Sequence, residues 1–246
     1  IHYAANRMRP LLVGTVPDEI VTPQRRHALD RWPERLAGRA VRAVDAHGKH
    51  LFLRFEGDLT LHSHLRMTGV WGVYRAGQRW GRSSRRAWLV LRARGHEVVE
   101  FDGPVLELMT DSRTRFDQRI ALLGPDIVAD EFDTATFLRR LREDDPTRGI
   151  GDALMNQRTV AGIGNMWKAE GCWDVAIDPW RPVREVSDAD ALAVIEALRP
   201  RMRASAERGM SSRDRPVQVF NRAGRPCPRC GTTIQARGQG DENRTT

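Results

Sequence analysis

The segment Asn156–Asn165 places a glycine-rich turn between two stretches whose apolar residues have helical spacing. The turn reads Gly162-Ile163-Gly164-Asn165, and its glycines allow the backbone to point several N–H groups in one direction. A helix that begins directly after such a turn adds the positive end of its dipole. The segment therefore predicts two helices joined by a turn that can bind a phosphate.

Cys227 and Cys230 lie near the end of the sequence and are separated by two residues. Two thiolates at this spacing make half of a four-thiolate zinc knuckle. No second Cys-x-x-Cys pair follows them in the sequence. We therefore expect Cys227 and Cys230 to be zinc ligands of a site that is incomplete in this chain. We interpret the third cysteine, Cys172, as a small core residue of an apolar helix.

The composition favours a folded protein that binds polyanions. Of the 246 residues, 40% are hydrophobic, which is enough for a core. The net charge is +8 and the pI is about 10.5, and such a surface attracts nucleic acid. No apolar run approaches membrane length and no signal peptide is visible, so we expect a cytoplasmic protein without a membrane partner. Only Lys49 and Lys168 are lysines, and every other basic residue is arginine.

The periodicity of apolar residues changes twice along the chain. Helical spacing at 1–12 and 22–31 gives way to short alternating runs between residues 38 and 110, and it returns after residue 126. The alternating runs predict strands of an antiparallel sandwich at 39–44, 49–55, 59–64, 70–74, 87–93 and 97–102. Later helices are predicted at 133–142, 151–157, 164–173 and 187–208, the last with a break near Arg199 because Pro200 follows.

Five motifs in this order resemble the formamidopyrimidine-DNA glycosylase and endonuclease VIII family. They are Gly48-Lys49-His50-Leu51, His62–Gly69, Leu123-Gly124-Pro125-Asp126, Gln157–Asn165 and Pro226–Gly231. Val70-Trp71 is more similar to the endonuclease VIII branch. The resemblance implies an α+β multidomain fold. It would comprise an N-terminal antiparallel β-sandwich with flanking helices (1–122), a helix–two-turn–helix domain (123–215) and an incomplete zinc-finger hairpin (216–246).

The same resemblance implies an activity in base-excision repair. Family members remove oxidised bases from damaged double-stranded DNA and cleave the abasic site, using an N-terminal proline as nucleophile and a structural zinc. We expect a monomer. The alternative from another class is a non-catalytic DNA-binding homologue. A weaker alternative is a ribosome- or topoisomerase-associated protein that shares only the helix–two-turn–helix.

The resemblance also implies residues that contact the phosphates of DNA. Lys49 matches the family lysine near the lesion, and the alternative is a solvated lysine at a strand end. Gly162, Gly164 and Asn165 would hold a second phosphate, with Asn165 also serving as N-cap of the following helix. Arg244 resembles the finger arginine that grips phosphates at the lesion.

Other matching residues would enter the DNA stack. Met67 resembles the side chain that fills the void left by a flipped nucleotide, and the alternative is a buried strand methionine. Phe116, with either Arg113 or Arg115, resembles the second wedge and its partner arginine. His62 and His64 lie on one face of a strand, where a metal pair is conceivable, but we interpret them as structural because no carboxylate or cysteine accompanies them.

The family's Pro-Glu start is not found in the sequence, and Ile1-His2 matches positions a few residues beyond it. We expect the chain to be a fragment without both functional ends, rather than a divergent inactive homologue. The codons upstream of Ile1 would separate the two.

The chain that starts at Ile1 is therefore expected to be inactive on oxidised bases and not to be trapped on DNA by borohydride. Lys49 is the one plausible substitute nucleophile within the chain. An ordinary lysine is almost fully protonated at neutral pH and is therefore a poor nucleophile. The measurement is borohydride trapping on an abasic-site duplex. A stable adduct that disappears in Lys49→Ala would contradict the prediction.

Overall fold

The computed structural model describes residues 1–209, 217–240 and 243–246. The chain folds into two compact units, Ile1–Ala121 and Leu122–Thr246. The domain boundary predicted between residues 215 and 216 lies outside the described residues.

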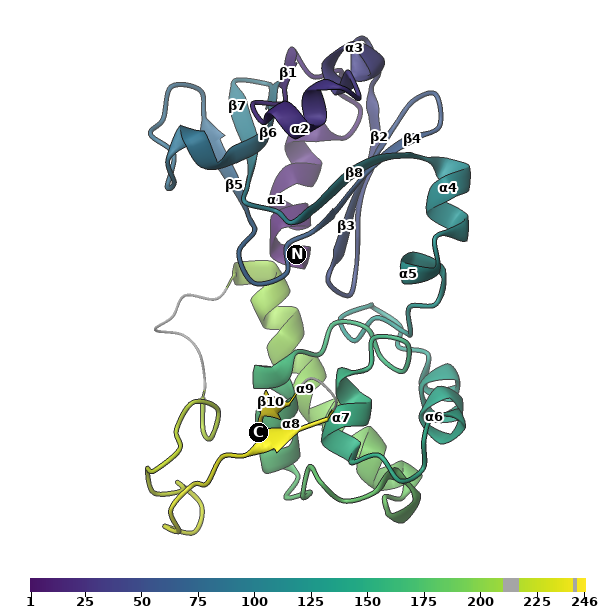
Figure 1. Cartoon of the computed structure of the whole chain (residues 1–246), viewed down its shortest axis with the longest axis vertical. Helices are drawn as coiled ribbons and strands as arrows, with labels where there is room; N and C mark the ends of the chain where they lie inside the picture. Colours follow the sequence, from purple (N-terminus) through teal and green to yellow (C-terminus); the bar gives the residue numbers. More distant parts are fainter. Residues whose placement is uncertain (210–216, 241–242) are drawn as a thin grey trace. The chain divides into compact units, whose positions relative to one another are not determined.

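The first unit contains two four-stranded antiparallel sheets (Figure 1). One sheet has the order β1-β6-β7-β5, with the strands Glu19–Val21, Ala87–Ala93, His96–Phe101 and Val70–Arg75. The other has the order β2-β3-β4-β8, with the strands Val41–His47, His50–Phe55, Leu59–His64 and Val105–Thr110. This arrangement confirms the predicted antiparallel β-sandwich.

The core of this unit lies between the two sheets. Leu51, Leu53 and Leu61 of one sheet join Leu89 and Leu91 of the other in one buried cluster. The alternation of apolar residues along β3, β4 and β6 places these side chains on the inner faces.

One polar contact crosses the core of the first unit. Ser63 donates a hydrogen bond to Glu100 Oε1 at 2.6 Å and accepts one from the indole of Trp71 at 3.1 Å. These bonds compensate part of the cost of burying the polar groups.

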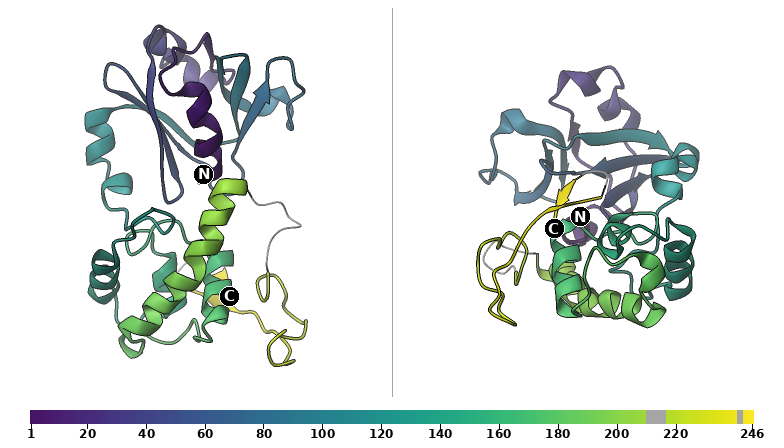
Figure 2. Two further views of the ribbon diagram at one scale, coloured as in Figure 1. Left: turned by 180° about the vertical axis from the view of Figure 1, so that it is seen from behind. Right: turned by 60° about the horizontal axis from the view of Figure 1, so that its bottom comes forward.

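Helix α1 (His2–Leu12) packs along the sandwich (Figure 2). Its buried residues Ala5, Met8 and Leu12 recur at helical spacing and join the core cluster. The helix runs beside β2, since Arg9 Nε donates to Val44 O at 2.8 Å. The predicted first helix is thus present.

The second predicted helix, 22–31, is wrong. The structure has two short helices instead, α2 (Arg25–Ala28) and α3 (Trp32–Leu36), with Arg31 between them in the left-handed region at φ 49°. A residue in this conformation ends a helix. Buried Trp32 anchors α3 in the core, so tertiary packing decides where the chain turns.

Two strands, β1 and β8, are not among the predicted strands. β1 has only three residues and exists through its pairing with β6. β8 follows Gly103-Pro104 and passes directly into α4 (Asp111–Phe116), which is followed by α5 (Gln118–Ala121). A short 3₁₀ helix, Ser84–Arg86, precedes β6.

The second unit is mainly helical. Its helices are α6 (Thr134–Glu143), α7 (Ile150–Met155), α8 (Asn165–Asp174), a 3₁₀ turn (Val183–Glu185) and α9 (Asp188–Arg208). Its core includes Phe137, Leu154, Ile163, Cys172 and Leu198, which confirms Cys172 as a core residue. The strand pair β9 (Gly238–Gln239) and β10 (Arg244–Thr245) lies in the same unit (Figure 1).

The break predicted near Arg199 is wrong, because α9 continues through Pro200. Its buried residues lie on both sides of the proline: Ala191, Val194, Ile195, Leu198 and Met202. Packing of this continuous face offsets the hydrogen bond that proline cannot make. In the part of the chain that the structure describes, no helix is both long and apolar enough to cross a membrane.

Candidate nucleic-acid interface

The connection between α7 and α8 is held by the side-chain amide of Gln157. Its Nε2 donates to the carbonyl oxygens of Met155 at 2.8 Å and Ile163 at 3.1 Å. Its Oε1 accepts the N–H of Gly162 at 3.0 Å, and Gly162 has φ 108°, where a side chain would be strained. The structure thereby corrects one expectation: the Gly162 N–H is already paired and does not face a phosphate.

Helix α8 begins one residue later than predicted. Gly164 is its N-cap, and Asn165 is its first helical residue rather than its cap. The first N–H groups of a helix have no partner within the helix, so this N-terminus can receive an anion. The side chain of Asn165 stands at the same point, and its role as a phosphate contact stays a prediction.

Arg244 is brought to this helix terminus by β10. Asn165 Nδ2 donates to the carbonyl of Thr245 at 2.7 Å, and Arg244 is the preceding residue. Asn165 Oδ1 is buried and has no hydrogen-bond partner among the described residues. Two of the predicted phosphate contacts, far apart in the sequence, thus lie together in the second unit.

Lys49 and Met67 are brought together in the first unit. The register of β3 against β4 places His50 opposite His64, so the β2–β3 turn that contains Lys49 and the β4–β5 loop that contains Met67 lie at one end of the sheet (Figure 1). Gly48, at φ 55°, permits the tight β2–β3 turn. Helix α1 begins at this same end of the unit.

Met67 is 90% exposed, so the alternative of a buried strand methionine is wrong. It lies in a turn rather than in a strand, with Arg66 in the left-handed region at φ 45°. A large apolar side chain at the tip of a loop contributes nothing to the core and remains available for a partner.

The loop that carries Met67 is fixed by residues that sequence reasoning missed. Thr68 Oγ1 donates to the carbonyl of Asp102 at 3.1 Å, and Arg82 Nη1 donates to the carbonyl of Thr68 at 2.9 Å. Asp102 also forms ion pairs with Arg82 at 2.9 Å and Arg86 at 2.6 Å. These residues come from the β5–β6 and β7–β8 connections, and no local motif marks them.

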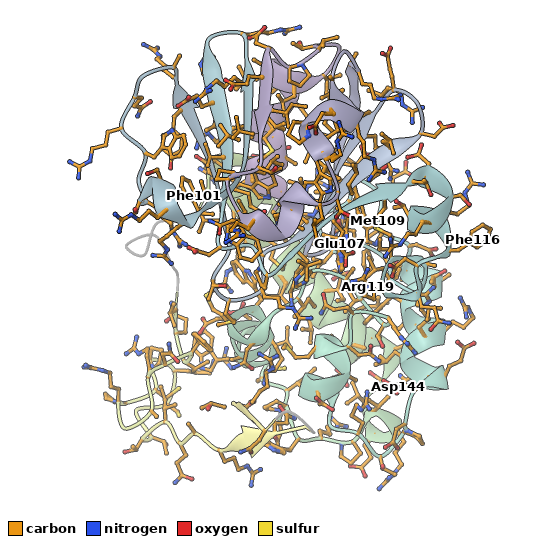
Figure 3. All side chains as sticks on the ribbon, turned by 45° about the horizontal axis from the view of Figure 1, so that its top comes forward. Phe101, Glu107, Met109, Phe116, Arg119 and Asp144 are labelled. Carbon is orange, nitrogen blue, oxygen red and sulfur yellow. The ribbon has the colours of Figure 1, made fainter. Side chains whose placement is uncertain are left out.

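Arg113, Arg115 and Phe116 are not brought to Met67. They lie on α4, which follows the end of β8 that pairs with Leu59, whereas Met67 follows the opposite end of β4. Phe116 is 76% exposed and projects outward from α4 (Figure 3). The geometry gives no support to a joint role of Phe116 and Met67, and the choice between Arg113 and Arg115 stays a prediction.

Three histidines, here called the histidine stack, lie together on the face of β3 and β4 that points away from the core. The rings of His50 and His62 are stacked, and the ring of His64 is tilted against that of His50. His50 and His62 are joined by a hydrogen bond of 2.8 Å between Nδ1 and Nε2, and the ring centroids of His50 and His64 are 4.6 Å apart. His62 Nδ1 lies 3.6 Å from Glu107, which is paired with Arg119 at 2.7 Å (Figure 3).

Burial is the main reason why the pKa values of all three histidines are lowered. It lowers the pKa of His50 from 6.5 to about 3 and that of His64 to about 4, and neighbouring positive groups, Lys49 among them for His64, add to the effect. The pKa of His62 is also lowered by burial, with Glu107 opposing. Neutral, mutually bonded rings fit the structural interpretation of His62 and His64.

Cys227 and Cys230 lie in a tight turn. Gly231 N–H donates to the carbonyl of Cys227 at 2.8 Å, and Cys227 N–H donates to Thr232 O at 2.8 Å. A hydrogen bond from the Trp173 indole lowers the pKa of Cys227 to about 7, with backbone N–H groups contributing. Across the described ranges, no cluster of three or more histidine, cysteine, aspartate or glutamate side chains could hold a metal ion.

A cavity of about 560 Å³ lies in the second unit, between the end of α8 and residues 219–246. Trp173, Trp180 and Phe220 are among its lining residues. Within the described part of the chain, none of the predicted DNA- or zinc-binding residues lines the cavity, but Thr245, which accepts the hydrogen bond from Asn165, does.

Comparisons with known proteins agree with this geometry. A family model described as Formamidopyrimidine-DNA glycosylase N-terminal domain matches residues 1–116, and one described as Formamidopyrimidine-DNA glycosylase H2TH domain matches residues 123–215. A Streptomyces coelicolor protein named Probable endonuclease 8 2 is 40% identical over 222 residues, which cover 85% of this chain and 76% of that protein.

Two further relatives extend the match. Endonuclease 8 2 of Mycobacterium bovis is 35% identical over 95% of this chain and 90% of its own length. A Mycolicibacterium smegmatis protein named DNA-(apurinic or apyrimidinic site) lyase Nei2 is 33% identical over 81% of this chain and 78% of its own length. Lactococcus lactis formamido-pyrimidine DNA glycosylase, solved with DNA containing an AP site, has a TM-score of 0.82 at 22% identity, covering 100% of this chain and 95% of that one, and so shares the fold.

The histidine stack predicts a loss of stability in acid. Folding depresses the pKa values of His50 and His64, so the unfolded chain binds more protons once the pH falls below about 6.5. Stability should be complete above that pH and should fall toward pH 4, by about 2 kcal/mol for each of His50 and His64 at pH 5. Denaturant titrations across this range measure it.

His50→Gln cannot titrate and should flatten this pH dependence. Phe52→Leu is the matched control, because Phe52 stacks on His62 with centroids 5.2 Å apart but carries no proton. It should lower stability equally at every pH. Equal acid slopes for the wild type and His50→Gln would refute the assignment.

Proposed function

We propose that this protein, which belongs to the formamidopyrimidine-DNA glycosylase and endonuclease VIII family, acts in the repair of damaged double-stranded DNA. It removes oxidised bases and cleaves the resulting abasic site. The observation that carries the proposal is the placement of Met67. It is an exposed apolar side chain on a fixed loop, beside the turn that contains Lys49.

DNA would be bound through its phosphates by groups in each unit. The N-terminus of α8 with Asn165 and Arg244 presents donors and positive charge, and Lys49 supplies charge in the first unit. Such contacts hold the duplex without reading its sequence. This suits an enzyme that must recognise damage in any sequence context.

Met67 would act after the damaged nucleotide leaves the stack. Flipping a nucleotide opens a gap between neighbouring bases, and an apolar wedge offsets part of that cost. The contacts of Thr68 with Asp102 and Arg82 keep the loop in place before DNA binds. Less ordering is then required on binding.

The chemistry implied by the family is attack of an amine on the sugar C1′ with departure of the damaged base. The sugar ring then opens to give an iminium, and β-elimination breaks the C3′–O bond to the phosphate. The family resemblance assigns this amine to an N-terminal proline. Lys49, Met67, Asn165 and Arg244 would bind and orient the DNA for that step. The naming of two of the relatives as endonuclease 8 proteins favours the endonuclease VIII branch.

Cys227 and Cys230 would supply two ligands of a structural zinc in residues 216–246. The lowered pKa of Cys227 and the tight turn suit thiolate ligation, but the described residues supply no third ligand. The two thiols thus fit half of the site.

The direct test is incision of duplexes that contain an oxidised base, an abasic site or no lesion, using the protein as its gene encodes it. The proposal expects incision of the first two and not of the third. Binding of the abasic duplex without incision would instead support the non-catalytic homologue.

Asn165→Ala should weaken binding of an abasic-site duplex by about 1 kcal/mol, the net contribution of one typical hydrogen bond. Fluorescence anisotropy titrations measure the change. Gln78→Ala, which removes an exposed amide of the β5–β6 loop, is the control and should bind like the wild type. Unchanged affinity in Asn165→Ala would remove Asn165 from the interface.

Met67→Ala should weaken binding of the abasic duplex by roughly 1.5 kcal/mol, because the lost apolar contact forms only in the opened stack. Binding of undamaged duplex should not change. Leu29→Ala is a matched control, since Leu29 is 91% exposed and lies on the α2–α3 connection. Equal losses on both duplexes for Met67→Ala would exclude the wedge role.

A further inference from the structure

Lys168 lies in the first turns of α8 and is only 1% exposed, which is unusual for a lysine. Its Nζ donates to Gln239 Oε1 at 3.2 Å and to the hydroxyl of Thr246. A buried ammonium costs free energy unless it is hydrogen-bonded, so these contacts determine whether Lys168 can stay where it is. Its partners lie on or next to the strand pair β9–β10.

Gln239 connects this lysine to the rest of the second unit. It is 7% exposed, and its Nε2 donates to the carbonyl of Pro179 at 2.6 Å. Its Oε1 also accepts a bond from Thr246 Oγ1 at 3.2 Å. One amide thus joins α8, the loop that follows α8 and the residue after β10.

The strand pair also lies very close to the start of α7. A Cβ added to Gly151 would stand 2.8 Å from Gln239 Oε1, and one added to Gly240 would stand 2.1 Å from Asp152 Oδ1. Glycine is required at both positions for this approach. The contact between α7 and β9 is therefore a close-packed one with a defined geometry.

The same strand pair carries the candidate phosphate contacts. Asn165, one turn before Lys168 on α8, donates to Thr245 O at 2.7 Å, and Arg244 is the adjacent residue. Any shift of β9–β10 along α8 would move Arg244 away from Asn165. The hydrogen bonds of Lys168 oppose such a shift.

We propose that Lys168 is a positioning residue, which docks β9–β10 on α8 through Gln239 and so holds Arg244 beside Asn165 at the helix N-terminus. Lys168 itself does not touch DNA. The consequence for DNA binding rests on the proposed function, whereas the docking does not.

The charges around Lys168 agree with this role. Burial lowers its pKa to about 8, Cys172 and Asp152 raise the pKa, and Arg244 lowers it. The ammonium form therefore still predominates at neutral pH. Arg244 is near enough to influence Lys168 electrostatically, as docking of β10 requires.

The docking can be measured without DNA, because Lys168 and Lys49 are the only lysines of the chain. Acylation with N-acetoxysuccinimide at pH 7.5, followed by mass spectrometry, reports each amine separately. Lys168 should react at least about tenfold more slowly than Lys49, because it reacts only when β9–β10 opens. Gln239→Ala should accelerate Lys168 acylation by about threefold or more without changing Lys49.

The matched control is Gln235→Ala, which removes the same side chain from an exposed position of the same segment. It should leave the reactivity of Lys168 unchanged. Equal reactivity of Lys168 and Lys49 in the wild type, or equal effects of the Gln239 and Gln235 variants, would overturn the docking.

Binding of an abasic duplex tests the consequence. Lys168→Met and Gln239→Ala should each weaken binding by about tenfold, and the double variant should lose no more than either, because both break one contact. Arg244→Ala should cost less in the Lys168→Met background than in the wild type. Gln239→Ala leaves α8 intact, so it remains informative if Lys168→Met unfolds.

A direct phosphate contact by Lys168 would give a different pattern. The losses of Lys168→Met and Arg244→Ala would then be additive, and Lys168→Met would reduce the salt dependence of binding by about one phosphate contact. That result would overturn the positioning role. If the wild type fails to bind the abasic duplex, the proposed function fails, while the acylation rates still decide whether β9–β10 is docked.

Discussion

The register of β3 against β4 is the constraint on which the first unit's part of the interface depends. His50 stands opposite His64, and this pairing brings the Lys49 turn and the Met67 loop to one end of the sheet. A shift by one residue would turn Leu51, Leu53 and Leu61 out of the core. The packing that stabilises the core therefore also fixes the position of Lys49 relative to Met67.

In the second unit, two side-chain amides position the backbone segments that carry the candidate phosphate contacts. Gln157 holds the backbone before α8 by three hydrogen bonds, and Gln239 holds β9–β10 against α8 and the loop that follows α8. Neither amide faces outward as a ligand would. Each fixes a backbone segment that carries the groups placed for phosphate, Asn165 in one case and Arg244 in the other. Side-chain amides are well suited to this because one group can donate and accept at once.

Local sequence patterns correctly predicted helices and strands with a regular spacing of apolar residues. They failed where contacts with residues distant in the sequence determine the structure. The alternation in β3 and β4 and the helical spacing of α1, α6 and α8 were sufficient. The three residues of β1 form a strand only through β6, and α9 passes Pro200 because its buried face continues beyond it. Neither fact is contained in a short window of sequence.

The candidate site shows the same division. Motifs located Lys49, Met67, Asn165 and Arg244. Phe116 was predicted as a second wedge, and the strand directions place it at the opposite end of β4 from Met67. The contacts of Arg82 and Lys168 join residues that are far apart in the sequence. The pairing of Gly162 with Gln157 depends on the direction of the Gln157 side chain. Only the folded chain reveals these contacts.

In the proposed complex with damaged duplex, the apolar side chain of Met67 is inserted into the opened stack. The most direct measurement is the fluorescence of 2-aminopurine placed next to an abasic position, which increases when the base loses its stacking neighbour. Saturating protein should increase this fluorescence, while the same probe in an undamaged duplex should not respond. An unchanged signal on fully bound abasic duplex would show that no side chain of the protein enters the stack.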